Sequence, residues 1–187
     1  MKILVACEFS GIVRDAFIRK GHNAISCDLL CSEAGGPHYQ GDVREIIDMG
    51  WDMMIAHPPC THLAVSGARY FKYKEKEQEL ALEFVRFLLD APIDRICLEN
   101  PVSIISTRIR KPNQIIQPWM FGVDASKKTC LWLKNLPQLE PTKIIVKDRY
   151  ANQTPSGQNN IGPSPDRWKE RSRTYPEIAK AMAEQWG

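Results

Sequence analysis

Two short stretches of this 187-residue chain combine side chains that could act together in catalysis. Cys60 follows Pro58 and Pro59, which stiffen the loop and keep the residue before each of them extended. The thiol is therefore held in a defined place, and a nucleophilic cysteine needs thiolate character and access there. Glu99 ends the apolar run at residues 93–98. A thiol with a carboxylate suits chemistry on a pyrimidine, in which sulfur adds to C6 and the acid stabilises charge on the ring.

The apolar pattern predicts the elements that would position these residues. Compact apolar runs bounded by Gly, Asp or Asn indicate buried strands, and apolar spacing of three to four residues indicates helices. We predict strands at residues 2–8, 23–27, 52–56 and 93–98, and helices at residues 12–20 and 75–90. Because strands alternate with helices, the fold class is α/β with a mostly parallel sheet.

The pattern changes beyond Pro101. Residues 129–133 and 142–147 read as strands, and the prolines between them favour a C-terminal hairpin. Residues 148–170 are rich in Asn, Gln, Ser, Pro and Gly, which predicts a long loop. Residues 175–186 read as a final helix with a proline near its start.

Polar side chains follow each of the four predicted parallel strands. In open α/β sheets, ligands bind outside the carboxyl ends of the strands. The residues at those ends are Glu8 to Gly11, Asp28, His57 to Cys60, and Glu99 with Asn100. A glycine before a helix lets backbone N–H groups approach a ligand, and an acid ending the second strand can bind ribose hydroxyls. The pair suggests an adenosine-containing ligand, with an ordinary turn as the alternative for Gly11.

The same loop allows a metal-site alternative. His57, Cys60 and His62 could ligate zinc, with Cys27, Cys31 or His38 as the fourth group. The compressed spacing is not a common zinc pattern, and the chain lacks the H-x-E and second cysteine of a zinc deaminase. We therefore expect no metal. Among the other thiols, Cys7, Cys97 and Cys130 lie within apolar strands and are expected to be inert core residues.

Composition sets the broad class. The chain is 43% hydrophobic and 25% charged, which is ordinary for one globular domain over residues 1–187. No apolar run approaches the ~20 residues of a membrane span, and six cysteines without a cleavable leader fit a reducing cytoplasm. Residues 1–100 hold 11 Lys/Arg and 15 Asp/Glu, whereas residues 101–187 hold 14 and 7. A basic second half suits a phosphate-bearing partner, and a merely solvated surface is the alternative.

In order along nearly the whole chain, the motifs resemble those of DNA cytosine-C5 methyltransferases, and most closely the short phage-type members. The matching stretches are Phe9-Ser10-Gly11, Asp28, Gly41-Asp42-Val43, Pro58-Pro59-Cys60 with Ser66-Gly67-Ala68-Arg69, Glu99-Asn100-Pro101, and Thr174-Tyr175-Pro176. The resemblance implies a single Rossmann-like domain, S-adenosylmethionine as the cofactor, and DNA with a flipped or single-stranded cytosine as the substrate.

The resemblance also implies roles for individual residues. Cys60 would be the nucleophile and Glu99 the acid that binds the ring. The cofactor would be bound by Phe9, Ser10, Gly11, Asp28, Asp42 and Pro58. The substrate would be bound by Asn100, Arg69, Lys127 and Lys128.

Two departures from the family pattern bear on the substrate. Lys127-Lys128 is the nearest match to a Q-x-R-x-R motif, whose arginines help to hold the base. Residues 147–172, a long basic loop, stand where the family has a large target-recognition region, so sequence-specific reading of DNA is not expected. The alternatives are the same chemistry on a free cytosine nucleotide, a non-catalytic protein that binds cofactor or DNA, and an amino-methyltransferase, which would carry an aromatic residue in place of Cys60.

Overall fold

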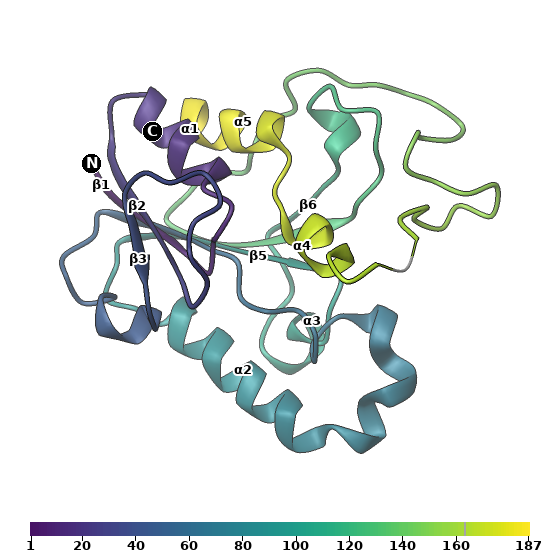
Figure 1. Ribbon diagram of the computed structural model, residues 1–187, viewed down its shortest axis with the longest axis horizontal. Helices are drawn as coiled ribbons and strands as arrows, with labels where there is room; N and C mark the ends of the chain where they lie inside the picture. The colour runs from purple at the N-terminus through teal and green to yellow at the C-terminus, as the bar shows by residue number, and fades with distance from the viewer. Residues whose placement is uncertain (163) are drawn as a thin grey trace.

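The computed structural model describes residues 1–162 and 164–187 and is built around one twisted sheet (Figure 1). Within those residues the sheet has seven strands in the order β3-β2-β1-β4-β5-β7-β6. The strands are β1 (Lys2–Ala6), β2 (Asn23–Asp28), β3 (His38–Gln40), β4 (Met53–Ala56), β5 (Arg95–Pro101), β6 (Gln114–Ile116) and β7 (Thr129–Lys134). The first five run parallel, and β7 lies antiparallel between β5 and β6. The predicted α/β class is confirmed.

Helices cover both faces of the sheet. The α-helices are α1 (Ile12–Arg19), α2 (Glu75–Leu89), α3 (Ile105–Arg108), α4 (Arg167–Ser172) and α5 (Pro176–Trp186). Short 3₁₀ segments are η1 (Val43–Glu45), η2 (Val65–Tyr73) and η3 (Pro118–Met120). In Figure 1, α1 and α5 lie together above the sheet and α2 lies below it.

Alternation along the strands explains the two layers, because successive side chains in a strand point to opposite faces. On β1, Ile3 and Val5 join the cluster that holds Phe17 of α1 and Met182 of α5. Leu4, between them, joins the opposite cluster with α2. Both faces of these strands are therefore buried, which is why they read as continuous apolar runs.

The predicted helix at 75–90 illustrates how the sequence pattern builds this layer. Leu82, Val85 and Leu88 are completely buried and lie at helical spacing on one face of α2. Glu75 and Glu77 occupy its first turn, where negative charge is favourable near the helix N-terminus.

The predicted C-terminal hairpin is wrong. Residues 129–133 do form β7, but residues 142–147 form no strand, and only Lys143 makes an isolated bridge to Phe121. The free edge of β7 is taken instead by Gln114–Ile116, a short apolar stretch that the sequence pattern did not single out. Pro141 starts a segment that runs along η3, with Ile145 N–H donating to the Trp119 carbonyl.

Two smaller corrections concern the site. Cys7 is not inside a strand, because β1 ends at Ala6 and Cys7 adopts a left-handed backbone with φ 59°. This turn directs the chain so that Glu8 N–H bonds the Cys27 carbonyl at 3.1 Å. The polar stretch 148–170 is also not all loop, since α4 begins at Arg167. Residue 163, which belongs to the predicted loop, lies outside the described residues.

No helix in the described part of the chain combines the length and apolar character that crossing a membrane requires.

Candidate active site

The register between β4 and β5 brings His57 beside Glu99. Ala56 pairs with Leu98 in parallel register, so the next residue of each strand follows at the same edge. His57 N–H donates to the Ala6 carbonyl at 2.9 Å, which continues the ladder to β1 by one residue. His57 Nδ1 then lies 3.3 Å from Glu99 Oε2, and the two side chains are 8% and 14% exposed. The structure therefore joins the two predicted motifs through a nearly buried imidazole–carboxylate pair.

A second contact fixes the loop that carries the cysteine. Asn100 is buried, and its Nδ2 donates to the Pro58 carbonyl at 2.9 Å. The Cys60 carbonyl accepts from the N–H groups of Leu63 and Ala64 at 3.0 and 2.9 Å, so a tight turn starts at the cysteine. The thiol-bearing residue itself is exposed. This geometry leaves a rigidly mounted, accessible thiol at the carboxyl end of β4.

The charges around Cys60 and Glu99 are coupled. Partial desolvation and the Glu99 carboxylate raise the pKa of the Cys60 thiol, while Lys127 and Arg171 act to lower it. Burial acts to raise the pKa of Glu99, but the hydrogen bond from His57 and the charge of Lys127 outweigh it, so that pKa lies below its ordinary value. At neutral pH the resting site therefore holds a protonated thiol and an ionised carboxylate.

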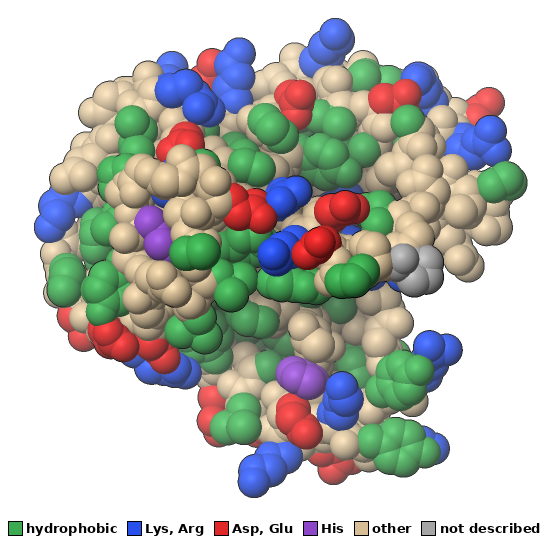
Figure 2. Space-filling view, in the orientation of Figure 1, with side chains coloured by type: hydrophobic (Ala, Val, Ile, Leu, Met, Phe, Trp, Pro, Cys, Tyr) green, Lys and Arg blue, Asp and Glu red, His purple; other side chains and the backbone are tan. Residues whose placement is uncertain are grey.

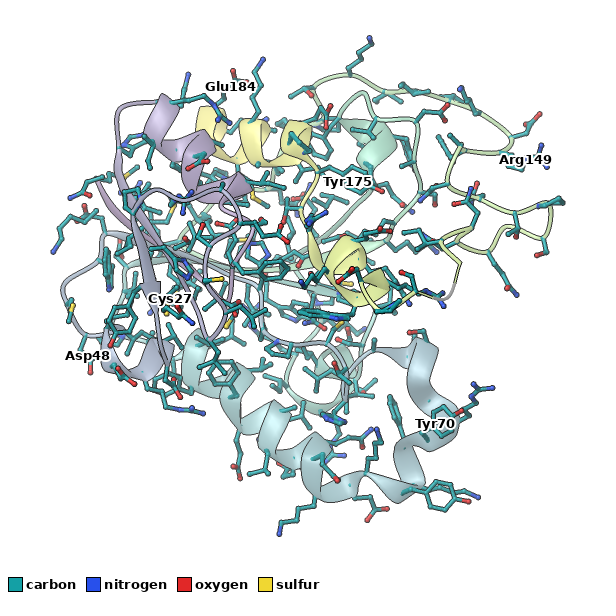
Figure 3. The ribbon with its side chains drawn as sticks, in the orientation of Figure 1. Cys27, Asp48, Tyr70, Arg149, Tyr175 and Glu184 are labelled. Atoms are coloured by element: carbon teal, nitrogen blue, oxygen red, sulfur yellow. The ribbon has the colours of Figure 1, made fainter. Side chains whose placement is uncertain are left out.

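The carboxylate faces a small cavity under the start of α5. The residues that line it are Glu99, Ile116, Lys127, Thr129, Thr174, Tyr175, Ile178 and Met182. Figure 3 shows the labelled Tyr175 in the middle of the molecule, where the chain passes from α4 to α5. Burial raises the pKa of Tyr175, so its hydroxyl stays neutral. The last predicted motif, Thr174-Tyr175-Pro176, thus lies beside the Glu99 motif although 75 residues separate them.

Glu8 and Gly11 shape the predicted cofactor loop. Glu8 is buried and its carboxylate accepts from Val13 N–H at 2.7 Å and Arg14 N–H at 3.2 Å, which caps the start of α1. Gly11 has φ 74°, and a Cβ there would lie 2.4 Å from Nη2 of Arg14. The positive φ therefore favours glycine at this position, and any side chain there would have to displace the Arg14 guanidinium.

The two predicted acids lie on neighbouring segments. Asp28 ends β2, is half-buried, and its Oδ1 accepts from Leu30 N–H at 3.0 Å. Desolvation raises the pKa of Asp28. Asp42 caps η1, accepting from Arg44 N–H at 2.9 Å and pairing with the Arg44 guanidinium at 2.8 Å. The backbone bond from Arg44 lowers the pKa of Asp42. Asp28 is the acid that lacks a cationic partner at this edge among the described side chains.

The basic segment before α5 folds over the predicted cofactor loop. The Phe9 ring, 7% exposed, lies 5.9 Å from the Trp168 ring of α4. Arg173 forms two 2.8 Å bonds to Glu33, whose N–H donates to the Phe9 carbonyl at 2.9 Å. Lys127 Nζ also donates to the carbonyls of Arg171 and Arg173. Figure 2 shows basic and acidic side chains gathered over the centre of this face.

Other predicted substrate residues are distributed more widely. Arg69 lies on the exposed segment η2, with its guanidinium 4.6 Å from the centre of the Tyr70 ring. Figure 3 places the labelled Tyr70 at the outer edge of the molecule, and a hollow in Figure 2 separates this lobe from the body. Lys128 is exposed, while Lys127 points into the site. Of the two lysines, Lys127 is the one that the fold brings to Cys60 and Glu99.

The proposed zinc ligands are not gathered. No group of three or more His, Cys, Asp or Glu side chains suited to a metal ion occurs within residues 1–162 and 164–187. His57 faces Glu99, whereas His38 contacts Ser26 and the Leu30 carbonyl near β2.

Sequence reasoning missed the pairing partner of Glu99 and the cover of Phe9. The sequence pattern places His57 at the strand ends and among the possible zinc ligands, but does not pair it with Glu99. Its position directly before the two prolines, next to a parallel strand that ends in Glu99, was the signal for that pairing. Trp168 lies in a polar, proline-rich stretch, and its single aromatic ring gave no periodic signal. Both the pairing of His57 with Glu99 and the packing of Trp168 on Phe9 depend on contacts between segments that are far apart in the sequence.

Comparison with known proteins supports the fold. No protein-family model matches the chain, and no curated protein matches it. Among solved structures, it is similar to a prophage-encoded E. coli protein described as a candidate DNA modification methyltransferase, with a TM-score of 0.50 and 15% identity. The match covers 78% of this chain and 52% of that protein, so this chain spans about half its length. The similarity establishes a Rossmann-like α/β fold of the kind that methyltransferases use.

Proposed function

We propose that this protein transfers a methyl group from S-adenosylmethionine to C5 of cytosine in DNA, with Cys60 as the nucleophile. The observation that carries the proposal is the buried hydrogen bond from Asn100 to the Pro58 carbonyl, which ties the segment that carries Glu99 to the segment that carries Cys60 at one edge of a methyltransferase-like sheet. A binding module has no need of an accessible thiol next to a buried carboxylate. An amino-methyltransferase would not need the thiol either.

The residues at the β1 and β2 ends fit S-adenosylmethionine. Gly11, with its positive φ, lets the chain turn into the start of α1, and the half-buried Asp28 could accept bonds from ribose hydroxyls. Phe9 gives an apolar surface beside them. We propose that Phe9, Ser10, Gly11, Asp28, Asp42 and Pro58 hold the cofactor, which would supply an electrophilic methyl group.

The proposed reaction uses the two side chains in sequence. Cys60 gives its proton to water and its sulfur bonds C6 of cytosine, while the electrons of the C5–C6 double bond move through C4 toward N3. Glu99 provides the proton that N3 takes, which stabilises the charge on the ring. C5 then takes the methyl group, loses its proton to water, and the sulfur–C6 bond breaks as N3 returns its proton.

Lys127 and Arg171 help this step electrostatically. Both lower the pKa of the Cys60 thiol, and Lys127 lies close enough to Glu99 to lower its pKa as well. Positive charge beside the sulfur favours the thiolate that attacks C6. We propose Lys127 as a substrate-site residue, together with Asn100, Arg69 and Lys128.

DNA is the proposed partner because one basic residue of α4, Arg171, lies near the thiol. Arg171 affects the Cys60 pKa directly, so a phosphate near α4 would lie next to the reacting base. A free cytosine nucleotide is the second candidate substrate. Residues 147–172 are much shorter than the target-recognition region of DNA cytosine-C5 methyltransferases, and an enzyme that acts on a free nucleotide would not need such a region.

Nucleoside mass spectrometry of DNA from cells that express the protein tests the proposal. We expect 5-methylcytosine above the level in cells that express Cys60→Ser at the same amount. The same lysates should be analysed for methylated free nucleotides, which separates the two substrates. Equal 5-methylcytosine in both DNA samples and both nucleotide pools would refute the cytosine-C5 assignment.

A further inference from the structure

His57 lies beside Glu99 at the centre of the site, and the proposed reaction assigns it no role. Its imidazole side chain is 8% exposed and its Nδ1 lies 3.3 Å from Glu99 Oε2. Its Nε2 is buried and has no hydrogen-bond partner among the described residues. A buried, unpartnered ring nitrogen costs free energy in the resting protein, so this arrangement needs a reason.

The fold holds the imidazole firmly. The backbone N–H of His57 is bonded to the Ala6 carbonyl, and the next residue, Pro58, is held through its carbonyl by Asn100. The ring therefore has little freedom to leave Glu99. A residue placed only to fill space between β4 and β5 would not require a polar ring in this rigid frame.

Glu99 alone is poorly suited to give a proton to the base. Its carboxylate is ionised at rest, because the His57 hydrogen bond and Lys127 outweigh the effect of burial and lower its pKa. The N3 atom of cytosine nevertheless needs a proton as the sulfur bonds C6. A neighbouring group that titrates near neutral pH can store that proton, and histidine is the side chain that does so.

We propose that His57 and Glu99 form one proton-sharing pair, in which His57 orients the carboxylate and stores the proton that Glu99 delivers to N3 of the bound cytosine. This inference rests on the proposed function and adds a positioning residue to it. As the sulfur bonds C6, Glu99 takes the proton from His57 Nδ1 and passes that same proton on to N3, so the carboxylate is ionised before and after the transfer. The imidazole becomes neutral, and it is recharged when N3 returns its proton after methyl transfer.

Other charged and titratable groups surround the pair and must be considered in any pH experiment. They are Lys127, Tyr175, Cys60, Cys97 and Cys130. Burial raises the pKa of each of these thiols and of Tyr175, so they remain protonated near neutral pH.

The test compares His57→Gln with the matched control His22→Gln. Glutamine can still donate a hydrogen bond to Glu99 but cannot carry a titrating proton. His22 lies at the other end of the molecule, next to the N-terminal amine. Each variant would first be checked for unchanged thermal unfolding and unchanged S-adenosylmethionine binding by calorimetry, because a purely structural role would alter these.

The kinetic readout is the rate of covalent adduct formation on an oligonucleotide that contains 5-fluorocytosine, measured from pH 5 to 9. We expect His57→Gln to slow adduct formation about tenfold or more at pH 7. In His57→Gln, the rate of adduct formation should begin to fall at a lower pH than in the intact protein. Without His57 the proton for N3 must be held by Glu99 itself, and a carboxyl group loses its proton at lower pH than an imidazole does. His22→Gln should keep both the rate and the profile. A His57→Gln profile that matches the intact protein would overturn the proposal.

A second measurement separates this proposal from the proposed function. Nitrogen-detected NMR of histidine-labelled protein reports which ring nitrogen of His57 carries the proton. We expect protonated Nδ1, and a titration of His57 that shifts to lower pH in Glu99→Gln, since the carboxylate no longer stabilises the imidazolium. If the intact protein forms no adduct, the cytosine chemistry fails while the NMR still decides whether the pair exists. If the NMR titration curve of His57 is the same in Glu99→Gln as in the intact protein, the proposal that the two residues share a proton is wrong.

Discussion

The side-chain amide of Asn100 donates to the Pro58 carbonyl across 2.9 Å, and so joins the ends of β5 and β4. The bond links the residue after the predicted acid with the residue two before the predicted nucleophile. Because Asn100 is 1% exposed, the contact is protected from water. This buried hydrogen bond between their neighbours therefore helps to fix the relative position of Cys60 and Glu99.

Asn100→Ala should weaken both stability and catalysis. The change leaves the Pro58 carbonyl without its donor in a buried place, which typically costs about 1–3 kcal/mol. Thermal or urea unfolding measures the loss, and Asn23→Ala, at an exposed position of β2, serves as the control with little change. We expect adduct formation at Cys60 to slow more than the stability loss explains, since the loop shifts. Unchanged unfolding of Asn100→Ala would show that the bond contributes nothing.

A covalent enzyme–base adduct should be trapped at Cys60. Fluorine at C5 replaces the proton that must leave after methyl transfer, and it cannot leave as a cation. Incubation with a 5-fluorocytosine oligonucleotide and S-adenosylmethionine should therefore give a denaturation-stable species, heavier by the oligonucleotide and one methyl group. Cys60→Ser should lose it, because a serine hydroxyl is a much weaker nucleophile at neutral pH. Cys31→Ser, at the other exposed cysteine, should keep it.

Alkylation kinetics should report the charges around the thiol. Burial and Glu99 raise the pKa of Cys60, so its reaction with iodoacetamide should be slow at pH 7 and rise with pH beyond the range of an ordinary thiol. Glu99→Gln removes a negative charge that raises the pKa of Cys60, and it should therefore speed the reaction at pH 8. Lys127→Met removes a positive charge that lowers the pKa of Cys60, and it should therefore slow the reaction. The exposed Cys31 provides the reference rate in each protein by peptide mass spectrometry, and equal Cys60 rates in both variants would contradict the coupling.

Asp28→Ala should weaken S-adenosylmethionine binding. The carboxylate would lose charge-assisted hydrogen bonds to the ribose, each worth about 1.5–3 kcal/mol, which corresponds to roughly tenfold or more in Kd. Calorimetry measures the change, with Asp48→Ala as the control; Figure 3 labels Asp48 at the far left edge of the molecule. Binding that Asp28→Ala leaves intact would remove Asp28 from the cofactor site.

The sequence by itself determined the four neighbouring parallel strands β2, β1, β4 and β5 and the positions of their polar ends. The runs around Val5, Ile55 and Cys97 are continuous and apolar because both faces of these strands are buried, and such runs can be recognised without tertiary information. Parallel strands place their carboxyl ends at one edge, so the clustering of Cys60 and Glu99 could be predicted from strand order alone.

Tertiary structure decided the contacts that the pattern does not encode. The partner of β7 could not be read from residues 142–147, because a short edge strand such as Gln114–Ile116 is selected by the space left beside β7 and has little signal of its own. The pairing of His57 with Glu99 depends on strand register, and the packing of Trp168 on Phe9 joins residues 159 positions apart. Sequence spacing fixes neither, because both depend on how distant segments pack once the sheet has formed.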